Sequence, residues 1–94
     1  MARLTSTLRS RVAAHRVADG ITQQQLAAAA EVSRQTIISI ERGDYAPSVI
    51  LALRLSLLLG VPVEQLFSLP DSEVEALARW RERFSSETKK EGSE

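Results

Sequence analysis

The segment Thr22–Gly43 carries the start and stop signals of two short helices that follow each other closely in the chain. Thr22 and Gln25 have the spacing of a capping box, in which each side chain bonds the backbone N–H of the other residue. Ser33 is an N-cap residue for a second helix, and Gly43 suits the positive φ angle at which many helices end. The segment is therefore predicted to fold as a helix, a tight turn and a second helix.

The apolar side chains of this segment fall on one face of each helix. They are Leu26, Ala27 and Ala30 in the first helix, and Ile37 and Ile40 in the second. Because the alanines are small, the two helices can cross closely at the turn.

The outer face of the second helix, residues 34–42, begins with side chains that suit nucleic-acid recognition. Arginine forms two hydrogen bonds with guanine, glutamine forms two with adenine, and threonine bonds several bases or contacts a thymine methyl group. Arg34, Gln35 and Thr36 occupy the first three positions. The segment therefore meets the physical requirements of a DNA-binding helix-turn-helix, whose second helix enters the major groove.

The segment from Leu8 to Leu69 resembles the Cro/cI-repressor-like (Xre-type) helix-turn-helix family of transcriptional regulators. The resemblance rests on four motifs taken together: G-I-T-Q-x-x-L-A, V-S-R-Q-T-I-x-x-I-E-R-G, P-S and L-G-V-P-V-E-x-L-F. It implies an all-α fold with a compact five-helix repressor-like DNA-binding domain. It also implies a regulator that binds double-stranded DNA, commonly as a repressor. No signal peptide is visible at the N-terminus, so a cytoplasmic protein is expected.

The chain is expected to contain this domain and a further helix. Residues 1–6 are expected to form a flexible N-terminal arm, which is either a disordered start or a DNA-contacting arm. Residues 7–69 form the helix-turn-helix domain, residues 70–86 an additional C-terminal helix for dimerisation or packing, and residues 87–94 a charged, disordered tail. The helices of the domain are expected over residues 7–18, 23–30, 34–42, 49–59 and 63–66.

The resemblance implies a set of DNA contacts around the two helices. The residues expected to face base edges are Arg34, Gln35, Thr36 and Ser39. The residues expected to contact phosphates are Arg16, Gln23, Arg42 and Tyr45. Gln23 lies at a helix N-terminus, which favours anions. The Tyr45 side chain either bonds a phosphate or only covers the core.

Arg16 also has a structural role by the same resemblance, because family members pair an arginine at this position with a glutamate at the end of the recognition helix. The matching glutamate in this chain is Glu41. A partly buried guanidinium–carboxylate fork would fix the first helix against the recognition helix.

Two residues depart from the family pattern. Glu31 occupies the turn position where glycine is usual, and a side chain at positive φ costs about 1 kcal/mol there. Asp44 stands where lysine is common, and its carboxylate would repel a phosphate. Both residues weaken the predicted DNA-binding segment without removing its pattern.

The helix expected over residues 49–59 is too apolar for a single buried face. Its residues expected in the core are Val49, Ala52, Leu53, Leu55 and Leu59. Three large residues then remain for a dimer interface, namely Ile50, Leu57 and Leu58. They predict that a second copy of the chain or the C-terminal helix covers this helix.

The C-terminal helix carries aliphatic and aromatic residues outside the DNA-binding domain. Ser72 and Glu75 have the spacing of a capping box at its start. The residues assigned to a dimer interface are Val74, Leu77, Trp80 and Phe84. Two other uses stay open, namely packing within the chain over residues 49–59 and binding of a different protein.

The composition restricts the possible functions. The 94 residues include no cysteine and one histidine, His15, so no metal or thiol site is expected. No phosphate-binding loop or paired-carboxylate cleft is recognisable, so we expect no enzymatic activity, no cofactor and no small-molecule ligand. The longest apolar run, residues 49–59, contains Arg54 and is too short to span a membrane.

The formal net charge is zero, but the charges are unevenly distributed. Residues 1–47 contain six arginines and four acids, whereas residues 48–94 contain six basic residues and eight acids. The half that holds the helix pair is therefore slightly positive, which allows few phosphate contacts per copy. Useful DNA affinity then predicts a homodimer.

These observations predict a sequence-specific transcriptional regulator, and specifically a dimeric repressor that inserts residues 34–42 into the major groove. The alternative is the DNA-binding antitoxin of a toxin–antitoxin pair, whose C-terminal helix would bind the toxin. A helical adaptor that binds only protein is a third alternative, but it would not need the Arg-Gln-Thr sequence at residues 34–36.

Overall fold

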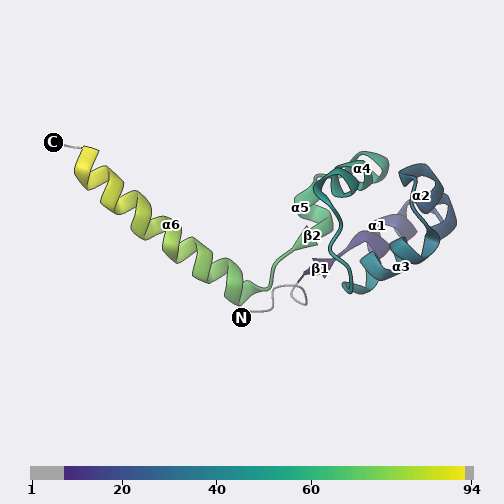
Figure 1. The fold of residues 1–94 in the computed structure, drawn as a ribbon, viewed down its shortest axis with the longest axis horizontal. Helices are drawn as coiled ribbons and strands as arrows, with labels where there is room; N and C mark the ends of the chain where they lie inside the picture. Colours follow the sequence, from purple (N-terminus) through teal and green to yellow (C-terminus); the bar gives the residue numbers. More distant parts are fainter. Residues whose placement is uncertain (1–7, 93–94) are drawn as a thin grey trace.

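Five helices within residues 12–66 of the computed structural model enclose one core, and a sixth helix projects from it (Figure 1). The structure describes residues 8–92, with side chains through residue 87. The helices are α1 (Val12–Ala18), α2 (Gln23–Ala30), α3 (Arg34–Arg42), α4 (Val49–Leu59), α5 (Val63–Leu66) and α6 (Asp71–Gly92). The short strands are β1 (Arg9–Ser10) and β2 (Phe67–Ser68). The predicted arm, residues 1–6, and residues 93–94 of the predicted tail lie outside the described residues.

Buried apolar side chains from α1 to α5 form the core. Those from α2 and α3 are the ones that the sequence pattern predicted: Leu26, Ala27, Ala30, Ile37 and Ile40. The others are Val12, Leu51, Leu55, Leu59 and Leu66. Because α2 packs against both α3 and α4, the helix pair is part of the core and not an appendage to it. The predicted all-α five-helix domain with an additional C-terminal helix is confirmed.

The helix pair begins and ends where the capping signals predicted. Oγ1 of Thr22 accepts a hydrogen bond from the N–H of Gln25 at 3.0 Å, and Oε1 of Gln25 accepts one from the N–H of Thr22 at 2.8 Å. Oγ of Ser33 accepts from the N–H of Thr36 at 3.1 Å. Gly43 ends α3 with a φ of 80°. Local bonds therefore determine the bounds of α2 and α3.

The residues before α1 are extended, contrary to the helix predicted over residues 7–18. Strands β1 and β2 pair in an antiparallel ladder, and the N–H of Arg11 donates to the carbonyl of Leu66 at 2.8 Å. Helix α1 therefore begins only at Val12. The prediction was wrong at this end because the hydrogen bonds that compete with the helix come from a segment far away in the sequence.

Helix α4 buries only part of the predicted core set, with Leu55 and Leu59 as expected and Leu51 in addition. Leu51, Leu55 and Leu59 are buried, and they lie four residues apart on one face. Val49 and Leu53, which were expected in the core, are 74% and 53% exposed. Since nearly every position of α4 is apolar, the periodicity was ambiguous, and packing against α2 and α5 selects the buried face.

Helix α6 differs from the prediction at both ends. It begins at Asp71, and the Pro70 carbonyl accepts the hydrogen bonds of its first turn, so the capping box predicted at Ser72 does not start the helix. It continues to Gly92, so the disordered tail predicted from residue 87 was wrong for residues 87–92. The sequence argument considered the missing apolar residues there, but glutamate and lysine are good helix formers.

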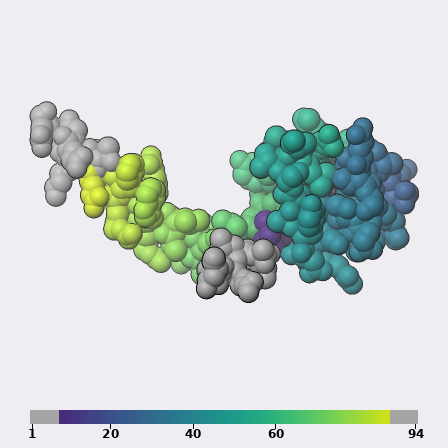
Figure 2. Space-filling model, in the orientation of Figure 1, coloured from purple at the N-terminus to yellow at the C-terminus, as the bar shows by residue number. Residues whose placement is uncertain are grey.

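Helix α6 leaves the core as a separate rod. Figure 2 shows it extending from the rounded body formed by the other helices. None of its side chains through residue 87 is buried, and it does not lie over α4 (Figure 1). In this structure α6 therefore does not pack over α4, which was one of the uses considered for it. No helix of the described residues is long and apolar enough to cross a membrane.

Candidate nucleic-acid interface

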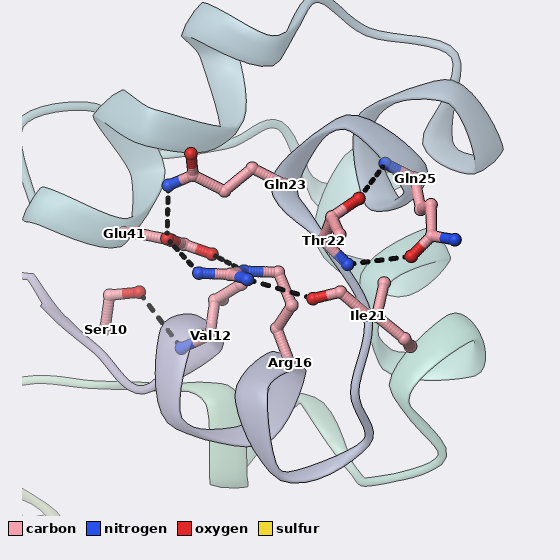
Figure 3. Close-up of polar contacts among 8 residues, drawn as sticks. All are labelled: Ser10, Val12, Arg16, Ile21, Thr22, Gln23, Gln25 and Glu41. Carbon is pink, nitrogen blue, oxygen red and sulfur yellow. Dashed lines mark hydrogen bonds and ion pairs between the residues drawn. The ribbon is translucent and has the colours of Figure 1, made fainter.

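Arg16 of α1 and Glu41 of α3 form the predicted ion pair (Figure 3). Nε of Arg16 donates to Oε2 of Glu41 at 2.6 Å, and Nη2 donates to Oε1 at 3.2 Å. Nη1 of Arg16 donates to the carbonyl of Ile21 at 2.9 Å. The side-chain amide of Gln23 donates to Oε1 of Glu41 at 3.0 Å. These hydrogen bonds join α1, α3 and the start of α2. The positive charge of Arg16 and the negative charge of Glu41 compensate each other.

The low exposure of this pair makes it structurally important. The side chains of Arg16 and Glu41 are 13% and 8% exposed. Removing one partner of a pair in such a place leaves the other charge poorly solvated, which is costly. The two-point geometry also fixes the angle between the helices more tightly than a single contact would. The pair therefore holds α3 in one orientation relative to α1 and α2.

The start of α2 opens into a recess that also contains the first residue of α3. The recess is lined by Arg16, Val17, Gly20, Ile21, Thr22, Gln23, Gln24 and Arg34. The N–H groups of Gln23 and Gln24 have no acceptor among the described residues. Helix N-terminal N–H groups and a nearby guanidinium attract anions. The side chain of Gln23 bonds Glu41, so its backbone N–H is the group left for a phosphate.

The outer face of α3 and the loop that follows it line a second, open groove. Its lining residues are Ser33, Gln35, Thr36, Ser39, Asp44 and Tyr45. Three of the four residues predicted to face bases, Gln35, Thr36 and Ser39, therefore share one groove. The Thr36 hydroxyl lies 2.9 Å from Oγ of Ser33, so it is partly engaged in the helix cap.

The two arginines of α3 lie at opposite ends of the helix. Arg34 is exposed at the first position and lines the recess at the start of α2, apart from the groove. Arg42 is exposed in the last turn. Tyr45 is 46% exposed, so its side chain is not a core residue. Asp44 lies on the wall of the groove, which places a carboxylate near the residues predicted to face bases.

The turn between α2 and α3 has the backbone conformation that was expected to be costly. Glu31 adopts a φ of 64° and a ψ of 42°. It is the one residue other than glycine with a positive φ in the described part of the chain. The N–H of Val32 donates to the carbonyl of Ala27 at 3.0 Å and closes the turn. Packing of the two helices therefore forces a glutamate into a conformation that glycine adopts more easily.

The sequence and the fold match those of known helix-turn-helix proteins. Residues 12–66, which include α1 to α5, match the family model described as helix-turn-helix. An uncharacterized HTH-type transcriptional regulator of Methanocaldococcus jannaschii is 39% identical over 66 residues, which are 70% of this chain and 100% of that protein. This chain belongs to the helix-turn-helix family. Its motifs are those of the Xre or Cro/cI type, and the family consists of DNA-binding transcriptional regulators.

Further relatives and solved structures share this helix-turn-helix architecture. The HTH-type regulator YgzD of Bacillus subtilis is 34% identical over 64 residues, which are 68% of this chain and 97% of that protein. The restriction-modification controller protein C.AhdI of Aeromonas hydrophila has a TM-score of 0.57 and 30% identity, over 61% of this chain and 86% of that one. A chain of the SinR–SinI protein complex has a TM-score of 0.57 and 27% identity, over 89% of this chain and 96% of that one.

Outside the helix-turn-helix segment, the residues assigned to a dimer interface form two separate exposed surfaces. The α4 surface contains the predicted Ile50, Leu57 and Leu58, joined by Val49 and Leu53. The α6 surface contains the predicted Val74, Leu77, Trp80 and Phe84. Both surfaces leave apolar side chains in contact with solvent, and their part in a dimer remains a proposal.

Sequence reasoning missed two features of these sites. Val49 and Leu53 had been assigned to the core, and no spacing corrects this, because Val49, Leu53 and Leu57 are four residues apart just as the buried leucines are. The bond from Gln23 to Glu41 was also missed. These two residues lie on different helices, and no local spacing relates them.

Proposed function

We propose that this helix-turn-helix protein is a dimeric, sequence-specific transcriptional repressor that inserts α3 into the major groove of double-stranded DNA. The observation that carries the proposal is the contrast between the two faces of α3. Ile37 and Ile40 are fully buried, while the opposite face presents short polar side chains to an open groove. Because α3 is held by the core and by Glu41, those side chains are presented in a fixed geometry, as recognition requires.

Base recognition falls to the residues on the outer face of α3. Arg34 would select a guanine and Gln35 an adenine, each through two hydrogen bonds that contribute about 1–3 kcal/mol of discrimination. Thr36 and Ser39 would add single hydrogen bonds or contact a thymine methyl group. The separation of Arg34 from the groove that holds the other three implies that the recognised bases span both sides of α3.

Phosphate contacts would set the position of α3 without selecting a sequence. The residues proposed for this role are Arg16, Gln23, Arg42 and Tyr45. Arg16 is committed to Glu41, so we assign it a shared role in the positive recess at the start of α2, where the backbone N–H of Gln23 is the direct donor. Asp44 opposes these contacts.

A dimer follows from the small positive charge of the helix-turn-helix half. Two copies double the number of phosphate contacts and place two recognition helices on half-sites about 34 Å apart. Such a dimer would repress by occluding a promoter. We propose that the protein is not an enzyme, uses no cofactor or small-molecule ligand, and acts in the cytoplasm. The similarity to regulatory proteins such as the controller protein C.AhdI supports a role in regulation.

The proposal is tested by a mobility shift with DNA from the protein's own upstream region. The wild-type protein is expected to give a discrete complex that unlabelled random DNA does not remove. Arg34→Ala is expected to weaken this complex by about tenfold to a hundredfold per half-site, which corresponds to about 1–3 kcal/mol for one bidentate base contact.

Arg34→Lys is the matched control, because it keeps the positive charge and loses the two-pronged geometry of the guanidinium. It is expected to retain binding to random DNA while losing preference for the specific site. If Arg34→Ala bound the specific site as well as the wild-type protein does, the base contact assigned to Arg34 would be refuted.

A further inference from the structure

Helix α6 presents an apolar stripe to solvent along its first four turns. Val74, Leu77, Trp80 and Phe84 are between 46% and 54% exposed. The Trp80 and Phe84 rings stack within the helix, with centroids 5.2 Å apart and planes 7° from parallel. No side chain of α6 through residue 87 is buried by another described segment. A solvent-exposed stripe that contains two aromatic rings is unusual for a surface without a partner.

The spacing of the stripe suits another helix. The intervals from Val74 to Leu77, Trp80 and Phe84 are three, three and four residues, which keep the side chains on one side of an α-helix. Intervals of three and four residues are those with which helices interlock their side chains along a shared seam. The guanidinium of Arg81 lies 5.8 Å from the Phe84 ring centre, so its stem adds to the stripe.

The charges of α6 are separated along its length. The first turns carry three acids and no base, namely Asp71, Glu73 and Glu75. The middle turns carry three arginines and one acid, namely Arg79, Arg81, Arg83 and Glu82. Glu73 and Arg81 lie four residues before and after Leu77, on the side of the apolar stripe, whereas Glu75 and Arg79 lie on the opposite side of the helix. If two copies of α6 ran parallel, Glu73 would face the partner subunit's Glu73 and Arg81 would face the partner subunit's Arg81. If they ran antiparallel, Glu73 of each copy would face the partner subunit's Arg81.

We propose that α6 pairs antiparallel with α6 of a second copy, with the twofold axis at Leu77. Residue 77 is the midpoint between the centre of the acidic segment, Glu73, and the centre of the arginine segment, Arg81. In this register Leu77 meets the partner subunit's Leu77, and Val74 meets the partner subunit's Trp80. The inference deepens the proposed function and rests on it, since it supplies the dimer that the repressor needs.

This pairing satisfies what a symmetric interface requires. A twofold interface uses the same surface on both copies, so the surface must complement itself in shape and charge. The α6 pattern does so in one direction only. The first residues of the two α6 helices would lie about 18 Å apart along the axis, at 1.5 Å per residue. The two DNA-binding cores would therefore lie at opposite ends of the helix pair. The twofold axis that relates them could coincide with the twofold axis of a palindromic operator.

The absence of cysteine in the chain allows a direct test with single-cysteine variants of the full-length protein. Leu77→Cys is expected to form a disulfide-linked dimer under mild oxidation, because this residue lies on the axis. Val74→Cys is expected not to, since its two copies would be offset by about 9 Å along the helices, beyond the reach of a disulfide. Mixing Val74→Cys with Trp80→Cys is expected to give a cross-linked dimer that contains one copy of each.

Three results would overturn the proposal. A parallel pair would cross-link both Leu77→Cys and Val74→Cys to themselves. A dimer that forms at another surface would remain in sedimentation, but none of the variants would cross-link. If the protein were monomeric at micromolar concentration, α6 would not pair with itself, and its apolar stripe would be assigned to binding a different protein, such as a toxin.

A charge exchange separates the orientation from the apolar contacts. A full-length variant with Glu73→Arg and Arg81→Glu keeps the four apolar residues of the stripe and exchanges the two charges beside it. It is expected to form its own dimer but to give far less than the statistical half of mixed dimers with the wild-type protein. A parallel pair would instead prefer the mixed dimer. Arg34→Ala is expected to leave all cross-links unchanged, so failure of the pairing and failure of DNA recognition are distinguishable.

Discussion

The helix pair α2–α3 and the helix α6 carry similar numbers of large apolar residues but use them differently. In α3, Ile37 and Ile40 are fully buried against the other helices of the same chain. In α6, Leu77 and Trp80 are each 54% exposed, and the helix stands apart from the core (Figure 1). The first region is therefore completed by its own chain, whereas the second has an apolar surface that its own chain does not cover.

This difference separates two parts of one function. The helix pair presents the side chains proposed to read bases, and its rigidity comes from the core and from the bonds between Arg16 and Glu41. Helix α6 contributes nothing to that rigidity. Under the proposed function, α6 joins two helix pairs into a dimer. The loss of DNA binding caused by changes in α6 should therefore depend on protein concentration, whereas the loss caused by changes in α3 should not.

Removal of residues 71–94 should have the largest effect on DNA binding. The truncated protein keeps the whole core, so it is expected to fold, but to bind DNA about 10²–10⁴-fold more weakly because each half-site is then bound separately. Fluorescence anisotropy with a two-half-site duplex measures the change, and a single half-site duplex is the control, which truncation should hardly affect. A truncated protein that stays dimeric would assign the interface to the exposed face of α4 and contradict the pairing of α6.

Replacing one large apolar side chain by alanine in each of the two regions should affect the free energy of unfolding to very different extents. Ile37→Ala is expected to lower the free energy of unfolding by about 2–5 kcal/mol, because it leaves a cavity in the core. Leu77→Ala is expected to change it by less than about 0.5 kcal/mol in the monomer, as exposed positions usually do. Urea unfolding at low protein concentration measures both values. Similar losses for the two variants would mean that α6 is part of the folding unit.

The sequence predicted the helix pair well because its information is local. The cap at Thr22, the cap at Ser33 and the stop at Gly43 are bonds within a few residues, and each is present in the structure. The fork between Arg16 and Glu41 is not local, and only the family resemblance indicated it. Local signals therefore determined the bounds of the candidate site, and resemblance supplied its tertiary contact.

The errors of prediction occur where tertiary contacts determine the conformation or the buried face of a segment, or where a segment makes no tertiary contacts. Strand β1 forms because its partner β2 lies at the other end of the domain, which periodicity cannot reveal. The buried face of α4 was misassigned because almost every residue is apolar and only packing chooses Leu51 over Val49. The end of α6 was placed too early because helix propensity alone sustains the helix there.

Loss of the ion pair should have an intermediate effect, confined to the helix-turn-helix region. Glu41→Gln is expected to lower the free energy of unfolding by about 2–3 kcal/mol, slightly less than for a fully buried pair, because Arg16 keeps its bond to the Ile21 carbonyl. Thermal unfolding measures the loss. Glu64→Gln on α5, where the residue is exposed, is the control and should be nearly neutral. If Glu41→Gln left the free energy of unfolding unchanged, the ion pair would not be what holds α3 in place.

The smallest expected effect is a gain, at the one strained residue of the helix pair. Glu31→Gly should raise the free energy of unfolding by about 1 kcal/mol, because glycine adopts the φ of 64° without the steric cost that a side chain incurs. Glu31→Ala keeps the side-chain clash and removes the charge, so it should leave stability nearly unchanged. Urea midpoints distinguish the two variants. The gain should persist in the protein that lacks residues 71–94, since the strain belongs to the turn and does not depend on α6. Equal stability of the glycine and alanine variants would contradict this prediction and would mean that the strain relieved by glycine does not exceed its unfolded-state entropy.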